Sequence, residues 1–177
     1  MRILIITDAW HPQINGVVRV LDKTAEMLRQ GGDEVMVIEP SMFPTLPAPG
    51  YPEVRLALMP GRKLGRMIED FAPDAIHIPV EGPLGLAAWR YCRKRGIPFT
   101  TSFHTRFGDY IEKRIGHGVD FAYALQRRFH NGGARMMVQT ATLERQLGER
   151  GFSNMAHWGR AVDLQTFHPV SYTHLRA

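Results

Sequence analysis

Three polar segments of this sequence carry residue types that could bind a ligand, and each segment follows a short apolar run. They contain Asp8 with Asn15-Gly16-Val17, then Glu81, then His104 with Arg106. Carboxylates and imidazoles bond hydroxyl groups, a guanidinium holds phosphates in a bidentate way, and a glycine lets backbone amides come close to an anion. The sequence therefore favours a ligand with phosphate or hydroxyl groups.

The first segment predicts an anion-tolerant turn. Asn15 is a predicted N-cap, and the apolar spacing from Val17 to Leu28 predicts a helix directly after it. Because Gly16 has no side chain, a ligand could approach the amides and the positive dipole of the helix N-terminus. An ordinary strand-to-helix turn would use the same residues, so both interpretations stay open.

The other two segments have the same character. Glu81 could bond sugar hydroxyls, and the glycines of Glu81-Gly82-Pro83-Leu84-Gly85 allow close approach, although this run also fits a helix entry with proline at the first position. His104 could donate to a hydroxyl or a developing oxyanion, and Arg106 could hold a phosphate. A lone histidine is more often structural, but a position at the end of a strand favours function.

The sequence does not contain the motifs of several other kinds of site. The eight histidines and the single cysteine form no H-x-x-x-H or C-x-x-C pair, so we expect no metal site. There is no G-x-S-x-G nucleophile motif, no G-x-G-x-x-G dinucleotide fingerprint and no phosphate-binding loop ending in G-K-[ST].

The elements that would position these residues alternate between short apolar runs and helical periods, which predicts an α/β fold with a Rossmann-like, doubly wound parallel sheet. Strands are predicted at 3–6, 35–38, 54–58, 75–78, 99–103, 135–138 and 156–158. Helices are predicted at 17–28, 64–71, 84–95 and 141–150, and residues 105–131 are predicted to be mostly helical with a break at 116–118. In such a sheet, ligands bind outside the carboxyl ends of the strands, where all three polar segments fall.

One long segment resists this pattern. Residues 40–52 contain five prolines, so we expect an irregular loop there between the second and third strands.

Composition narrows the class of protein. Hydrophobic residues make up 44% and charged residues 22% of the 177, the balance of a soluble globular protein, and the net charge is +5. A lone cysteine, Cys92, favours a reducing, cytoplasmic location, and no apolar run is long enough for a signal peptide or a membrane span. Basic residues at 62–66 and 113–128 suggest peripheral contact with an anionic membrane, although ordinary solvated helix faces are the favoured interpretation. Scattered basic groups argue against nucleic-acid binding.

Taken in order, these motifs resemble the N-terminal domain of family 4 retaining glycosyltransferases of GT-B fold. The resemblance rests on Thr7-Asp8 with Asn15-Gly16-Val17, on His77 with Glu81 to Gly85, on Ser102 to Arg106, and on a last segment from Trp158 to Pro169. Ala161 stands where the family usually has glycine. The nearest subgroups resemble bacterial mannosyl- or glucosyltransferases that act on lipid-linked or sulfolipid-type acceptors.

The resemblance implies a residue-by-residue assignment. Asn15, Gly16 and Val17 would face the diphosphate of a nucleotide-sugar donor such as GDP-mannose or UDP-glucose, and His104 would be the catalytic residue at the transferred sugar. Asp8, Glu81 and Arg106 would bind a lipid or glycan acceptor. It implies transfer with retention, without a metal or another cofactor.

The resemblance also implies a domain plan. Residues 1–160 would form the acceptor-side domain, 161–169 would begin the interdomain linker, and 170–177 would be a non-native or disordered tail. The donor-binding C-terminal domain would be missing, so we expect this chain to be inactive alone. The alternative is a non-catalytic, Rossmann- or flavodoxin-like ligand-binding module whose residues 160–177 pack back onto the sheet.

Overall fold

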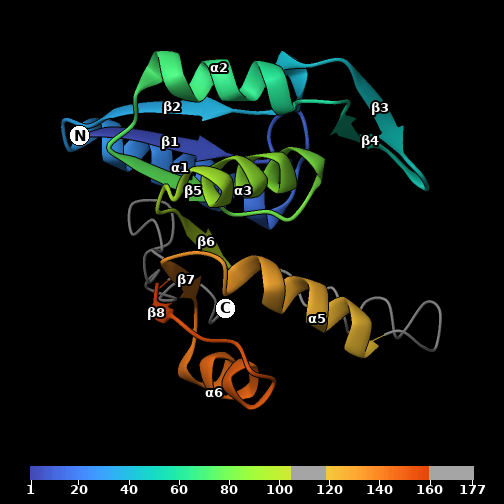
Figure 1. The fold of residues 1–177 in the computed structure, drawn as a ribbon, viewed down its shortest axis with the longest axis vertical. Helices are drawn as coiled ribbons and strands as arrows, with labels where there is room; N and C mark the ends of the chain where they lie inside the picture. Colours follow the sequence, from blue (N-terminus) through green and yellow to red (C-terminus); the bar gives the residue numbers. More distant parts are fainter. Residues whose placement is uncertain (105–118, 160–177) are drawn as a thin grey trace, which may run out of the picture.

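A parallel sheet of six strands forms the centre of the computed structural model, which describes residues 1–104 and 119–159 (Figure 1). The strands lie in the order β2-β1-β5-β6-β7-β8, and every neighbouring pair is parallel. Their bounds are β1 Arg2–Ile6, β2 Glu34–Ile38, β5 Ala75–Ile78, β6 Thr100–Ser102, β7 Arg135–Val138 and β8 Met155–His157. The predicted α/β class and parallel sheet are confirmed.

The direction in which the chain adds strands reverses once. From β1 the chain moves to β2 on one side, and every later strand of the sheet is added on the other side, starting with β5. The gap between the carboxyl ends of β1 and β5 is therefore the topological switch point, the place where open α/β sheets bind ligands.

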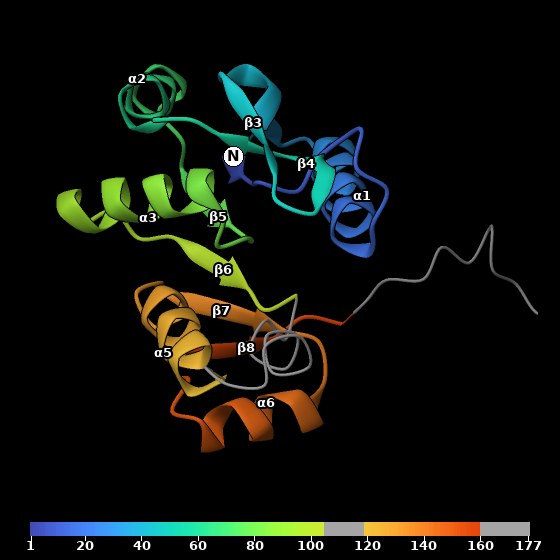
Figure 2. The ribbon, with the colours of Figure 1, turned by 90° about the vertical axis from the view of Figure 1, so that its right-hand side faces the viewer.

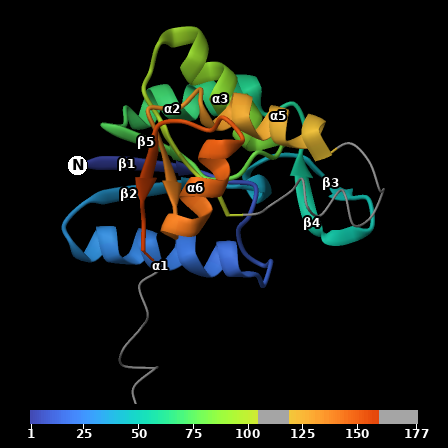
Figure 3. The ribbon, with the colours of Figure 1, turned by 90° about the horizontal axis from the view of Figure 1, so that it is seen from below.

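The helices divide between the two faces of the sheet. Their bounds are α1 Gly16–Gln30, α2 Gly61–Phe71, α3 Pro83–Arg95, α5 Val119–His130 and α6 Ala141–Glu149. Alternate residues of β1 separate the faces: Leu4 and Ile6 pack with α2 and α3, whereas Ile5 packs with Ala25 of α1. The same face as α3 continues over β7, where Met136 and Val138 pack with α5 and α6. Figures 2 and 3 show α1 across the sheet from α3 and α5.

Local sequence explains the helix ends. The side chain of Asn15 accepts hydrogen bonds of 3.0 Å from the amides of Val17 and Val18, so the predicted N-cap of α1 is confirmed. α3 begins at Pro83 and ends at Arg95, and the next residue, Gly96, adopts the left-handed conformation that glycine favours. Within the described residues, no helix has both the length and the apolar character needed to cross a membrane.

The prediction of an irregular loop at residues 40–52 is wrong. A short 3-10 turn, η1 Pro40–Met42, leads into an antiparallel hairpin of β3 Thr45–Ala48 and β4 Tyr51–Ala57. Each strand of a two-stranded ribbon has a free edge, so prolines without an amide hydrogen are tolerated there. The strand predicted at 54–58 belongs to this hairpin and does not enter the main sheet; Figure 1 shows the hairpin beyond the arrowheads of β1 and β2.

The interpretations of residues 105–118, 161–169 and 170–177 lie outside the described residues. They include Arg106, the break at 116–118, and the linker and tail boundaries.

A buried carboxylate joins the two strand ends at the switch point. Asp8, which follows β1 and is 5% exposed, accepts hydrogen bonds from the amides of Leu84 at 2.9 Å and Gly85 at 2.8 Å. These amides belong to the first turn of α3, where the helix dipole favours a negative charge. Asp8 therefore fixes the start of α3 to the end of β1.

Two glycines beside this contact leave no room for a side chain. A Cβ at Gly82 would lie 2.3 Å from Cγ of Asp8, and a Cβ at Gly85 would lie 1.9 Å from the carbonyl oxygen of Val80. Both distances are far below any real carbon contact, so the glycines of this run are explained by the packing of the protein itself.

Alanine substitutions should distinguish the collision at Gly82, which involves Asp8, from the collision at Gly85, which involves the backbone. We expect Gly82→Ala to cost about 2 kcal/mol of unfolding free energy, because it displaces Asp8 from two buried amides. Most of that cost should vanish in an Asp8→Ala background, where the colliding carboxylate is gone. Gly85→Ala collides with backbone instead, so its cost should remain in that background. Urea denaturation of the three single variants and the two double variants tests this. Purely additive costs for Gly82→Ala and Asp8→Ala would contradict the contact.

The charge of Asp8 should make stability depend on pH. Burial raises the pKa of Asp8 to about 6, against the opposing effect of the Gly85 and Leu84 amides, and the charge of Glu81 raises it further. A carboxyl group whose folded-state pKa is raised stabilises the fold below its unfolded pKa, and this contribution is lost as the pH rises through about 6. Between pH 7 and pH 5, Asp8 alone should therefore add about 1 kcal/mol to the unfolding free energy.

The Asp8→Asn variant provides the comparison. Urea denaturation at pH 7, 6 and 5 gives the unfolding free energy of both proteins. As the pH falls, the unfolding free energy of the wild type should rise relative to that of Asp8→Asn. A difference that stays constant across the three pH values would mean that Asp8 does not titrate in this range.

Candidate functional site

The predicted site residues follow neighbouring strands of the sheet. Asp8 and Gly16 lie after β1, Glu81 lies after β5, and His104 lies after β6. The carboxyl ends of these parallel strands share one edge, and β1 and β6 are separated only by β5. At the usual strand spacing this puts the ends of β1 and β6 about 10 Å apart.

Hydrogen bonds from two side-chain amides hold the loop from Asp8 to Gly16. Gln13, 8% exposed, donates from its side chain to the carbonyl of Asp8 at 3.0 Å, and Asn15 donates to the side chain of Gln13 at 3.2 Å. Asn15 thus uses its nitrogen to brace the loop and its oxygen to cap α1. Gln13 was missed in the sequence because a glutamine in a loop carries no distinctive pattern.

Gly16 differs from the glycines around Asp8. Apart from its chain neighbours and the backbone of α1 itself, a Cβ built on Gly16 would meet no atom of the described residues within 4 Å, and the residue is exposed at the first position of α1. Neither packing nor a left-handed backbone requires glycine here. The amides that Asn15 caps are those of Val17 and Val18, so the amide of Gly16 is not one of them.

The predicted acceptor residues are engaged with the protein. Both carboxylate oxygens of Asp8 bond to the start of α3, as described above. Glu81 accepts two bonds at its Oε1 atom, from Gln126 at 2.8 Å and from His130 at 3.0 Å. Its side chain remains 27% exposed. Neither contact tests whether these residues bind a substrate, so that role stays a prediction.

His104 lies in an aromatic setting. Its ring is 6.0 Å from the indole of Trp158, and the same indole is 6.2 Å from the ring of His77. His77 bonds Thr100 through Nδ1 at 2.8 Å and Ser102 through Nε2 at 3.0 Å. Burial and the nearby His104 lower the pKa of His77 to about 3, so His77 is neutral at physiological pH.

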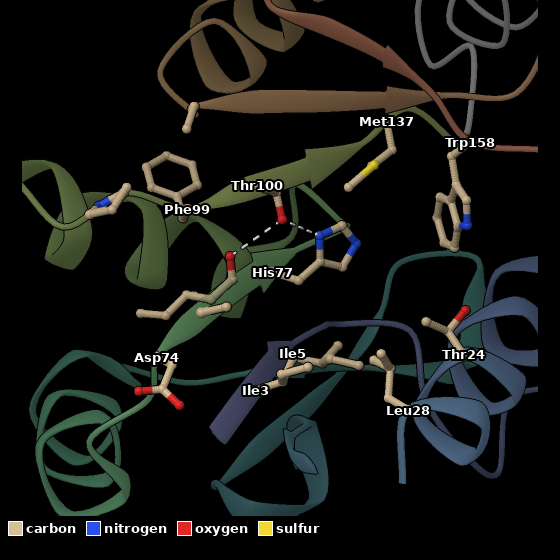
Figure 4. A pocket seen from close by; sticks show the side chains of 14 residues that line it. Ile3, Ile5, Thr24, Leu28, Asp74, His77, Phe99, Thr100, Met137 and Trp158 are labelled. Carbon is tan, nitrogen blue, oxygen red and sulfur yellow. Dashed lines mark hydrogen bonds between the residues drawn. The ribbon is translucent and has the colours of Figure 1, made fainter. Parts of the chain in front are cut away.

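A pocket of about 380 Å³ adjoins this aromatic group (Figure 4). It lies on the face of the sheet that carries α1, and most of its walls are apolar. The lining includes Ile3, Ile5, Leu28, His77, Met137 and Trp158. The pocket extends along the sheet face toward the amino ends of the strands, and it meets the carboxyl edge at Trp158, whose ring is 6.0 Å from that of His104.

The described residues contain no group of three or more metal-ligating side chains. What the edge offers is an exposed helix N-terminus at Gly16, an imidazole at His104 and a half-buried carboxylate at Glu81. Such groups can bind an anion, donate to hydroxyls and accept from hydroxyls.

Comparisons with known proteins place these features in a family. A family model described as Glycosyltransferase Family 4 matches residues 14–166. Two GDP-mannose-dependent alpha-mannosyltransferases are each 26% identical to this chain: that of Mycobacterium tuberculosis over 96% of the chain and 50% of its own length, and that of Mycolicibacterium smegmatis over 99% and 52%. The alpha-monoglucosyldiacylglycerol synthase of Streptococcus pneumoniae is 25% identical over 63% of the chain and 28% of its own length.

The chain spans about half the length of the mannosyltransferases that it matches. The family model itself covers residues 14–166, well over half of the chain, and these residues include the turn at Gly16, the carboxylate of Glu81 and the imidazole of His104. The chain belongs to glycosyltransferase family 4.

Proposed function

We propose that this chain forms the acceptor-side half of a retaining glycosyltransferase that transfers a hexose, mannose or glucose, from a nucleotide-sugar to a lipid or glycan acceptor. Membership of the family supports the reaction class. The names of the relatives, two of which use GDP-mannose and one of which makes a glucosyl lipid, support the donor and acceptor classes.

The observation that carries the proposal is the exposed glycine at the switch point. Among the described residues, nothing requires glycine at residue 16, whereas a diphosphate that bonds the first amides of α1 would require an open approach. The helix dipole would offset part of the diphosphate charge, so the proposed reaction needs no metal and no further cofactor.

The proposed reaction is a front-face substitution. The acceptor oxygen bonds the anomeric carbon as the bond from that carbon to the donor phosphate breaks on the same face. The acceptor proton passes to the leaving phosphate oxygen, so no protein nucleophile takes part. His104, two strands from Gly16 at the same edge, would hydrogen-bond the transferred sugar and support the positive charge that develops on it.

The proposal extends to a peripheral contact with an anionic membrane. Arg62 and Arg66 are exposed on the outer side of α2, and Lys63, also exposed, reaches the carbonyl of Met42 at 2.6 Å. Such side chains would attract anionic headgroups, by about 1 kcal/mol for each residue close to the surface.

The direct test is sugar transfer by a longer protein that joins this segment to a second half of the kind the relatives possess. With GDP-mannose or UDP-glucose as donor and octyl mannoside or diacylglycerol vesicles as acceptor, the longer protein should transfer sugar and the 177-residue chain should not. His104→Ala should lower kcat by roughly a hundredfold, because a group that supports transition-state charge is lost.

Gly16→Ala is the matched probe of the donor site. It should raise the donor KM roughly tenfold while leaving the melting temperature unchanged, because its methyl group would collide with none of the residues that the structure describes. Gly82→Ala, which does collide, serves as the control that lowers the melting temperature. Transfer by the 177-residue chain alone, or a Gly16→Ala variant with an unchanged donor KM, would contradict the proposal. For the proposed membrane contact, we expect anionic lipid in the vesicles to raise the rate of transfer to diacylglycerol.

A further inference from the structure

A buried network holds Glu81 at the carboxyl edge of the sheet. His130 Nε2 lies 3.0 Å from Oε1 of Glu81, and the side-chain nitrogen of Gln126 donates to the same oxygen at 2.8 Å. On its other side, His130 Nδ1 lies 2.9 Å from the hydroxyl of Thr101. Both contacts to Glu81 therefore end on Oε1, and neither uses Oε2.

The two partners of the ion pair differ in exposure. His130 is fully buried, and three aromatic rings surround it at centroid distances of 5.2 to 6.1 Å: Phe103, Phe129 and Phe152. Glu81 keeps 27% of its side chain exposed. The histidine is thus enclosed by the protein, and of the two side chains only that of Glu81 is open to solvent.

The charge of Glu81 decides which atom of this network carries the shared hydrogen. Burial alone would raise the pKa of Glu81, but the hydrogen bond and charge of His130, with the bonds from Gln126 and from the backbone of Glu81 itself, hold it below its usual value. An ionised carboxylate only accepts, so His130 Nε2 carries a hydrogen and donates it. The hydroxyl of Thr101 lies at the other ring nitrogen, Nδ1, and fixes the second side of the ring.

Stability alone gives little reason for such a pair. Buried ion pairs often contribute no more than apolar side chains of the same volume, and the pocket around His130 is already aromatic. What the network does fix is orientation, because it ties one oxygen of Glu81 from two sides. It also keeps a negative charge near Asp8, whose own pKa the charge of Glu81 raises.

We propose that His130 is a positioning residue, which holds Oε1 of Glu81 inside the protein and leaves Oε2 to accept a hydrogen bond from a hydroxyl of the acceptor. This rests on the proposed function, since it gives the carboxylate of that site its orientation. Thr101 and Gln126 support the same arrangement. The ligand class is a polyhydroxylated acceptor such as a sugar, bound through a hydroxyl.

The test compares variants of the longer protein with GDP-mannose and octyl mannoside. His130→Phe fits the aromatic surroundings but donates nothing, so the acceptor KM should rise roughly tenfold, the effect of losing one bond to a charged group. The donor KM should stay within about twofold of wild type. His130→Gln, which keeps a donor near Nε2, should recover most of the loss.

Two further variants guard against a folding defect. Thr101→Val keeps the shape of a buried strand residue and should raise the acceptor KM more mildly than His130→Phe. Phe129→Leu disturbs the packing on the ring of His130 without touching Glu81, and should leave the acceptor KM unchanged. If Phe129→Leu and His130→Phe raise the acceptor KM equally, the proposed positioning role of His130 is wrong. It is also wrong if His130→Gln does not bring the acceptor KM back toward the wild-type value.

A second readout separates this proposal from the proposed function. Carboxyl carbon NMR of the 177-residue chain should show a higher pKa for Glu81 in His130→Phe than in wild type, and a return toward wild type in His130→Gln. A longer wild-type protein without transfer activity would overturn the proposed function, whereas an unchanged Glu81 pKa in His130→Phe would overturn the positioning of Glu81 by His130.

Discussion

The contact between Asp8 and the first turn of α3 is the constraint on which the rest of this edge depends. It ties the end of β1 to the helix that follows β5, and so fixes both sides of the switch point with one buried carboxylate. Its geometry leaves no room for a side chain at Gly82, while the carbonyl of Val80 leaves none at Gly85. The composition of the segment from residue 82 to residue 85 is therefore a consequence of packing.

That constraint gives the two helix N-termini at the switch point different properties. The first amides of α3 are already bonded to a carboxylate, so this terminus is closed to an outside anion. The start of α1 is capped at Val17 and Val18 by Asn15 but is open around Gly16. An incoming diphosphate would therefore find its anion site at α1, whereas the proposed acceptor would meet Glu81, which His130 and Gln126 of α5 contact. The proposed anion contact at Gly16 and the proposed acceptor contact at Glu81 thus follow the neighbouring strands β1 and β5.

Much of the fold could be predicted because buried parallel strands are continuous apolar runs and helices show a clear period. The hairpin could not, since five prolines between residues 40 and 52 argue against regular structure unless the strand has a free edge. The positions of Asp8, Glu81 and His104 at one edge follow from strand order. Their partners do not: His130 and Gln126 lie about 45 residues or more from Glu81, and only the packing of α5 brings them there.

The central claim is that Gly16 and His104 contact one donor molecule at the carboxyl edge of the sheet. Titration of the longer protein, labelled with nitrogen-15, with GDP-mannose measures this directly. We expect the backbone amide of Gly16 and the ring nitrogens of His104 to shift together along one binding curve, with the ring of the enclosed His130 unaffected. Shifts confined to the second half of the protein, or to residues that line the apolar pocket beside α1, would contradict the account.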